Sequence, residues 1–154
     1  MRLQMASRLA IYSVLELAAN PDATLSAARI SEKYGVSTHH LNRVLRVLGR
    51  AGLVSATRGV GGGYQFCGNS KRTTLLDIIE LFESVGEPRN RDAGEIGTTA
   101  ENRVLGRVLR EIDDMAQATL DSITIATMLR LVDDRRSSDP VSEVPKRRGR
   151  KSLL

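Results

Sequence analysis

Apolar side chains in the first third of the chain recur at the three- and four-residue spacing of α-helices, in three short segments separated by turn residues. The first segment, residues 3–19, is followed by the turn-forming run 20–22, Asn-Pro-Asp. The second, residues 26–34, stops at Gly35. The third begins at Ser37, a candidate helix N-cap. Two helices joined by so short a glycine turn predict a helix–turn–helix.

The third segment is amphipathic, and a hairpin pattern follows it. Four aliphatic side chains form its apolar face: Leu41, Val44, Leu45 and Leu48. Gly49 and Gly52 mark its end. Residues 53–57 then predict a strand, residues 58–63 a glycine-rich turn and residues 64–67 the returning strand. A helix–turn–helix followed by a hairpin predicts a winged helix–turn–helix domain.

The second half of the chain contains further helix starts. The run from Thr74 to Asp77 has the spacing of a capping box, and the apolar side chains after it predict a helix that packs on the winged domain and ends near Gly86. Residues 86–98 are polar and aperiodic and predict a mobile loop. Residues 98–101 predict a second capping box, which opens the longest helix. A break near Asp121, with a new N-cap at Thr124, predicts a short final helix.

The longest predicted helix carries apolar side chains at alternating steps of four and three: Leu105, Val108, Ile112 and Met115. This is the spacing of a coiled-coil seam. The seam favours a homodimer, because the helix follows a predicted loop and DNA-binding proteins of this kind commonly bind two half-sites as dimers. Packing of the seam against the chain's own domain is the alternative.

The predicted fold is therefore mainly α with a small β-hairpin wing, a winged helix–turn–helix domain plus a long dimerisation helix. Residues 1–85 form the DNA-binding domain and residues 86–98 the loop. Residues 99–134 form the dimerisation helix and the short final helix. Residues 135–154 lack apolar periodicity and predict a disordered basic tail.

The net charge of +5 conceals an uneven distribution along the chain. Residues 1–73 hold ten lysines and arginines against three acids, residues 74–134 six against thirteen, and residues 135–154 seven against two. A basic first half beside an acidic second half indicates nucleic-acid contact at one end of the molecule and a different role at the other.

Composition excludes several classes of protein. No apolar run is long enough to span a bilayer and no signal-peptide pattern is present, so a soluble cytoplasmic protein without a membrane partner is expected. One cysteine excludes an internal disulfide framework, and 3% aromatic content disfavours single-strand binding by base stacking. The chain shows no nucleophile elbow, P-loop or metal-binding His pair, so an enzyme is not expected.

The candidate DNA-binding residues lie on the third helix and the wing. An α-helix fits the major groove, where Asn, Arg, Ser and Thr side chains read base edges, while a glycine-rich tip with a long arginine can approach the minor groove. The alternative is a solvated helix followed by an ordinary glycine turn. The predicted contacts are Ser37, Thr38, His39, His40, Asn42, Arg43, Arg46, Arg58, Gly59, Gly61, Gly62 and Tyr64.

No metal site is expected. His39 and His40 are adjacent on a helix and point about 100° apart, so we interpret them as residues that face DNA or start the helix. Cys67 lies on the returning strand, where a half-buried structural thiol is favoured over a redox sensor.

Several segments resemble the Rrf-two (Rrf2) family of bacterial winged-helix repressors. They are the N-terminal MRLQMASRLAIYSVLELA, the segment ISEKYGVSTHHLNRVLRVLGRAGLV, the wing RGVGGGY and the following TLLDIIE. The similarity covers residues 1 to about 85 closely. It implies a homodimer on a near-palindromic promoter site, with the helix from Ser37 in the major groove of double-stranded DNA and the wing at the minor groove.

The chain departs from that family where an iron–sulfur cluster is bound. Members with a cluster use three cysteines in the loop before the long helix, and residues 85–105 contain none here. Some members also use an acidic ligand in the first helix, where this chain has Arg8. Because thiolates hold such clusters, no cofactor is expected. The signal would instead be a small molecule, a partner protein or a ligand near residues 86–98.

The basic tail leaves a second function open. Residues 145–152, PKRRGRKS, resemble the core of an AT-hook but lack the proline that follows it, and a tail that only adds solubility is the alternative. An accessory or architectural DNA-binding protein would bind mainly through electrostatics, with a steep salt dependence and little sequence preference.

Overall fold

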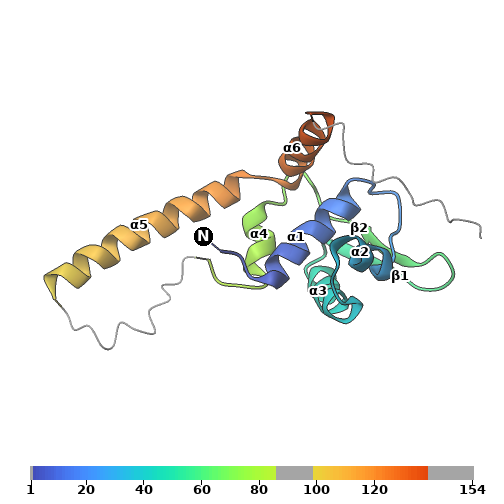
Figure 1. Cartoon of the computed structure of the whole chain (residues 1–154), viewed down its shortest axis with the longest axis horizontal. Helices are drawn as coiled ribbons and strands as arrows, with labels where there is room; N and C mark the ends of the chain where they lie inside the picture. Colours follow the sequence, from blue (N-terminus) through green and yellow to red (C-terminus); the bar gives the residue numbers. More distant parts are fainter. Residues whose placement is uncertain (1, 86–98, 139–154) are drawn as a thin grey trace, which may run out of the picture.

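The computed structural model describes residues 2–85 and 99–138, and within them the chain is mainly helical with one two-stranded sheet (Figure 1). The elements in order are α1 (Met5–Ala18), α2 (Ala27–Tyr34), α3 (Thr38–Arg50), β1 (Val54–Thr57), β2 (Gly63–Phe66), α4 (Leu75–Glu80), α5 (Ala100–Ser122) and α6 (Ile125–Ser138). The predicted mainly α fold with a β-hairpin is confirmed.

The hydrophobic core forms around α1, which contacts α3, α4, α6 and β2. Its fully buried large side chains come from five helices: Leu9, Val14, Leu17, Ile30, Leu41, Leu45, Leu48, Ile78, Ile79 and Ile125. Burying one such side chain stabilises a fold by about 1.5–3 kcal/mol. The apolar face predicted for the third helix is therefore the face that anchors α3 to the rest of the domain.

Capping residues fix the α2–α3 turn. Ser26 caps α2, and Gly35 ends it in the left-handed region with φ 64°. The Val36 amide then donates to the carbonyl of Ser31 at 3.0 Å, and the Ser37 hydroxyl accepts from the His40 amide at 3.1 Å. The predicted helix–turn–helix and the Ser37 cap are both confirmed.

The wing is an antiparallel hairpin in which Val54 pairs with Phe66 and Thr57 with Gly63. Its strands begin and end within a residue of the prediction. A third segment, which the sequence pattern did not predict, joins it: Leu25 pairs with Tyr64 through backbone hydrogen bonds of 2.9 and 2.8 Å. The loop between α1 and α2 therefore extends the sheet.

The capping box at α4 is confirmed, since Asp77 and Thr74 exchange hydrogen bonds of 2.8 and 3.1 Å. The predicted end near Gly86 is wrong, because α4 stops at Glu80. Backbone hydrogen bonds between residues three apart close the helix there. The Glu83 carboxylate then accepts from the Ser7 hydroxyl at 2.5 Å. This tertiary contact redirects the chain.

The break between α5 and α6 is confirmed, and the hydroxyl of Thr124 accepts from the Thr127 amide at 3.2 Å. The cap of α5 is Thr99, one residue later than predicted. The final helix reaches Ser138 instead of residue 134, so residues 135–138 are helical and not part of a disordered tail. The predictions for residues 86–98 and 139–154 lie outside the described residues.

The elbow between α5 and α6 is fixed to the winged domain. The amides of Ile125 and Ala126 donate to the carbonyls of Thr73 and Ser70 at 2.9 and 2.8 Å, and the Leu75 amide donates to Ile123 at 2.9 Å. Ile125 is completely buried. The C-terminal end of the long helix is thus attached rigidly to the segment that follows the wing. None of the described helices is long and apolar enough to cross a membrane.

Candidate nucleic-acid interface

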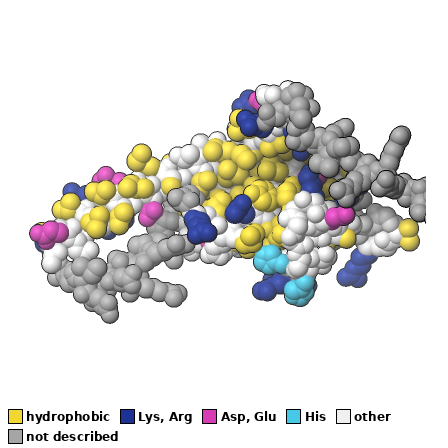
Figure 2. Space-filling view, in the orientation of Figure 1, with side chains coloured by type: hydrophobic (Ala, Val, Ile, Leu, Met, Phe, Trp, Pro, Cys, Tyr) yellow, Lys and Arg dark blue, Asp and Glu magenta, His cyan; other side chains and the backbone are white. Residues whose placement is uncertain are grey.

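The polar side of α3 points away from the core. Leu41 and Leu45 are fully buried on one side of the helix, while Arg43 and Arg46 are exposed on the other and Asn42 is half-buried. Figure 2 shows histidine and basic side chains along the edge of the molecule formed by α3. Among the described residues, neither arginine has an ion-pair partner. Their guanidinium groups are therefore available to a phosphate or a base edge.

The two hydroxyl groups at the start of α3 already have partners within the chain. Ser37 caps the helix, and the hydroxyl of Thr38 lies 2.9 Å from that of Ser31 on α2. The Thr38 contact joins α3 to α2, while the Ser37 cap fixes where α3 begins. Their predicted role in DNA contact would have to be added to this structural one.

The two histidines have different surroundings. His39 is exposed, whereas His40 is half-buried and its Nε2 is a buried atom with no hydrogen-bond partner in the described part of the chain. That part also contains no group of three His, Cys, Asp or Glu residues that could hold a metal ion.

The tip of the wing is built from glycines. Gly59 and Gly61 have φ values of 102° and 76°, which L side chains rarely adopt. A Cβ on Gly62 would collide with the carbonyl oxygen of Thr57, so the turn can close only with glycine there. The tight turn leaves Arg58 exposed.

One residue that sequence reasoning missed is Val60, which is fully exposed at this tip. Apolar side chains at such positions can wedge against sugars and bases in a minor groove. The sequence feature that could have identified it is a valine between two glycines in an otherwise polar turn.

The wing is tied to the loop between α1 and α2. Besides the Leu25–Tyr64 pair, the Thr24 hydroxyl donates to the Gly61 carbonyl at 3.2 Å. A Cβ on Gly63 would lie 2.6 Å from the Leu25 carbonyl oxygen, so this close approach also needs glycine. Tyr64 is half-buried and packs on the core, which makes it a structural residue whatever its contact with DNA.

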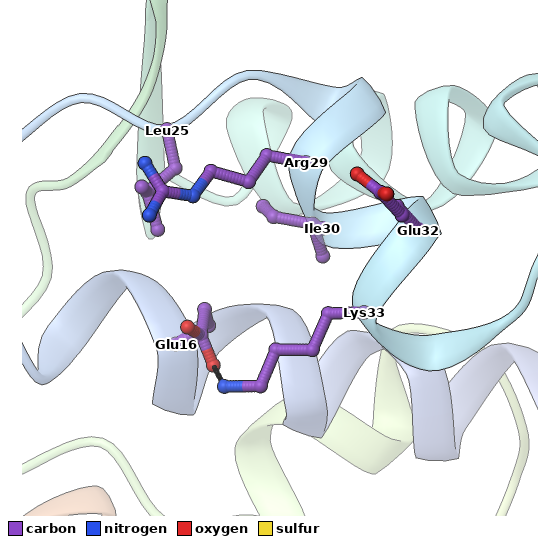
Figure 3. A pocket seen from close by; sticks show the side chains of 6 residues that line it. All are labelled: Glu16, Leu25, Arg29, Ile30, Glu32 and Lys33. Carbon is purple, nitrogen blue, oxygen red and sulfur yellow. Dashed lines mark hydrogen bonds and ion pairs between the residues drawn. The ribbon is translucent and has the colours of Figure 1, made fainter. Parts of the chain in front are cut away.

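A cleft of about 340 Å³ separates α1 from α2 (Figure 3). Across it, Lys33 pairs with the Glu16 carboxylate at 2.5 Å, and the Tyr34 hydroxyl donates to the same oxygen at 3.1 Å. Burial, then the charge and hydrogen bond of Glu16, raise the pKa of Tyr34 to about 12. The hydroxyl, which is protonated at neutral pH, links α2 to α1 through Glu16 and helps to hold α2, and through it α3, in place.

Cys67 is exposed directly after β2, so the half-buried position expected for it is wrong. Its thiol lies 3.3 Å from the carbonyl oxygen of Gly52. As the single cysteine of the chain, it cannot supply the thiolate set that an iron–sulfur cluster requires.

The predicted seam lies on α5, away from α3 and the wing (Figures 1 and 2). Its four members are between 46% and 70% exposed: Leu105, Val108, Ile112 and Met115. No residue of α5 is buried. The alternative, in which the seam packs on the chain's own domain, is therefore wrong for the described residues.

Known proteins match the chain along most of its length. The Rrf2 family, described as an iron-dependent transcriptional regulator, matches residues 3–131. A Rhodopseudomonas palustris protein, provisionally named HTH-type transcriptional regulator BadM, is 49% identical over 136 residues, covering 88% of this chain and 86% of that protein. The HTH-type transcriptional regulator IscR of Escherichia coli is 31% identical over 133 residues, covering 84% and 80%.

Solved structures agree with this fold. T. potens IscR has a TM-score of 0.66 and 25% identity, covering 88% of this chain and 91% of its own. B. subtilis CymR, described as the global cysteine regulator, has a TM-score of 0.70 at 24% identity, covering 85% and 98%, and supports the fold alone. The chain therefore belongs to the Rrf2 family, as a winged helix–turn–helix transcriptional regulator that binds DNA and is not an enzyme.

Proposed function

We propose that the protein is a homodimeric repressor that binds a near-palindromic site in double-stranded DNA and carries no iron–sulfur cluster. The observation that carries this proposal is the exposed seam of α5. Four aliphatic or thioether side chains in one stripe are costly to leave in water, and a second copy of the same helix covers them with matching spacing.

The length of α5 supports a pair of half-sites. Its 23 residues span about 34 Å at about 1.5 Å per residue. In an antiparallel pair the two winged domains, each attached near the C-terminal end of its helix, lie at opposite ends. That separation is on the order of one turn of B-DNA, about 34–36 Å, which is the usual spacing of half-sites.

Within each half-site α3 enters the major groove. Arg43, Arg46 and Asn42 supply the donors for base edges and phosphates, and His39 lies beside them on the exposed side. The wing places Arg58 and Val60 at the adjacent minor groove. In this proposal, occupation of promoter DNA by the dimer blocks transcription.

The signal that releases the DNA is not a cysteine-bound cluster. The family description includes iron dependence, but residues 68–154 of this chain contain no cysteine and Cys67 lies at the wing. A small molecule or a partner protein is the alternative source of the signal.

The test combines mass measurement, footprinting and transcription in vitro. The protein should be dimeric by light scattering, protect two half-sites upstream of a regulated gene and reduce transcription from that promoter. Ile112→Asp should give monomers and abolish specific binding, because a charge in the seam would be buried without a partner. Dimers that bind normally despite Ile112→Asp, or stoichiometric iron and sulfide after anaerobic purification, would contradict the proposal.

A further inference from the structure

The cleft between α1 and α2 combines an apolar floor with charged walls (Figure 3). Its volume of about 340 Å³ lies at the lower end of the range of small-molecule sites, about 300–1,000 Å³. Ile30, which is 1% exposed, and the half-buried Leu25 form the apolar part. This floor can receive the hydrocarbon part of a small molecule.

Two cationic side chains of α2 line the same cleft. Arg29 and Lys33 are four residues apart, so they lie one turn apart on the same side of the helix. Lys33 pairs with Glu16 at 2.5 Å, whereas no described residue makes an ion pair or a hydrogen bond with the Arg29 guanidinium. In Figure 3 that guanidinium extends over the cleft toward Leu25. A guanidinium one turn from an ammonium group suits a carboxylate, which can accept hydrogen bonds from both.

The acidic side chains of the cleft limit the charge of a ligand. Glu16 of α1 and Glu32 of α2 complete the lining, so its two cations are matched by two carboxylates. A ligand with one carboxylate can be held between Arg29 and Lys33. A second negative charge on the ligand would lie near the two glutamates without a further cation to match it. The lining therefore favours a monocarboxylate with an apolar body.

An entering carboxylate would compete for the ion pair that spans the cleft. The side chains of Lys33 and Glu16 are 45% and 25% exposed, so a small anion can reach the ammonium group. The other end of α2 has a separate attachment, because the Tyr34 ring stacks on Tyr12 with ring centroids 5.1 Å apart. Loss of the Lys33–Glu16 pair would therefore loosen α2 beside the cleft while its C-terminal end stays attached to α1.

The walls of the cleft are connected to both elements of the candidate DNA-binding surface. Leu25 pairs with Tyr64 of the wing through two backbone hydrogen bonds. On the other side of α2, the Ser31 hydroxyl lies 2.9 Å from that of Thr38 at the start of α3. A ligand between Leu25 and α2 would thus act on the wing and on α3 together.

We propose that this cleft binds a small monocarboxylate with an apolar body, held by Arg29 and Lys33, and that its binding lowers the affinity of the protein for DNA. This inference rests on the repressor function proposed above and gives the chemical class of its signal. The coupling is reciprocal: DNA lowers the affinity for the carboxylate by the same factor as the carboxylate lowers the affinity for DNA.

Binding is tested first without DNA, by calorimetry on the full chain with hexanoate as the probe. Three compounds with a six-carbon chain are the controls: 1-hexanol lacks the charge, hexylamine reverses it and adipate adds a second carboxylate. Hexanoate should bind at least ten-fold more tightly than each of them, a ratio within reach of charge-assisted hydrogen bonds to two cations. Equal affinity for hexanoate and any of the three would overturn the proposed site.

Two substitutions should change hexanoate binding in opposite directions. Arg29→Ala should weaken it about ten-fold, because one of the two cations is lost. Glu16→Gln should tighten it about three-fold or more, since the amide no longer competes for Lys33 but keeps an oxygen that can accept from Tyr34. Arg107→Ala is the matched control, because Arg107 is exposed on α5 and does not line the cleft. A merely structural role of Glu16 would not tighten binding of the probe.

The link to DNA is tested by titrating operator DNA with and without saturating hexanoate. The dissociation constant should rise about ten-fold for the wild-type protein, within the usual range of coupling between two sites. At the same hexanoate concentration it should change less for Arg29→Ala. Hexanoate bound without any effect on operator affinity would overturn its role as the signal.

Two further outcomes separate this inference from the proposed function. Weaker operator binding by Arg29→Ala, with hexanoate binding unchanged, would make Arg29 a phosphate contact and remove the ligand site. A protein that recognises no specific DNA site but shows the expected hexanoate affinities would contradict the repressor and support the carboxylate site.

Discussion

At the scale of single residues, the proposed DNA-binding surface divides into groups already engaged within the protein and groups that are free. The hydroxyls of Ser37 and Thr38 are used to cap α3 and to join it to α2. Arg43, on the exposed side of α3, and Arg58, at the wing, have no ion pairs among the described residues. The free groups are therefore the ones whose removal should change binding without disturbing the fold.

Alanine at Arg43 and at Arg58 should have different consequences. A lost bidentate contact to a base costs about 1–3 kcal/mol and relaxes specificity at one base pair, whereas a lost phosphate or groove contact weakens all sites about equally. Arg43→Ala should therefore reduce the difference in affinity between operator and scrambled DNA, while Arg58→Ala should lower the affinity for both. Titrations of both variants on both DNAs measure this, with thermal melts as the control for folding. If neither variant binds less tightly, α3 and the wing do not form the DNA contact.

At the scale of elements, sequence reasoning succeeded where local chemistry determines the outcome. The apolar period of α3, the caps at Ser37 and Thr124 and the glycine turn of the wing all act within a few residues. The end of α4 could not be predicted from local sequence, because it depends on the contact of Glu83 with the N-terminal end of α1. Leu25 was missed for a related reason, since one residue paired to the wing leaves no strand pattern.

That pairing predicts opposite effects for one substitution at two glycines. Gly63→Ala places a Cβ 2.6 Å from the Leu25 carbonyl oxygen and should destabilise the protein by about 1–3 kcal/mol, because two backbones must separate. Gly49→Ala is the control: it lies within α3, its Cβ would be 3.7 Å from the nearest atom, and it should stabilise by about 0.5–1 kcal/mol. Denaturant titrations of both variants measure the two free energies. A Gly63→Ala protein as stable as wild type would show that the wing is not held at Leu25.

At the scale of the whole molecule, charge and apolar surface are separated. The winged domain is basic and carries α3, the helix proposed to face DNA, whereas the segment 74–134 is acidic and carries the exposed seam. The acidic segment would repel DNA, which in the proposed homodimer leaves the seam to the second copy. The charges of the last residues do not fit this division, because the run after Val144 is strongly basic.

That basic run, Pro145 to Ser152, lies outside the described residues, and its role is tested through salt. Each phosphate contact contributes about 0.9 to the slope of log affinity against log salt concentration. If the tail binds DNA, truncation after Val144 should reduce that slope by about two to five units, because the removed run contains five cationic side chains. The preference for the operator over scrambled DNA should stay nearly the same. Binding isotherms of both proteins at several salt concentrations, on operator and scrambled DNA, provide the comparison. A slope unchanged by the truncation would assign the tail to solubility alone. A steep slope for the full chain, with little difference in affinity between operator and scrambled DNA, would favour an accessory DNA-binding protein over a specific repressor.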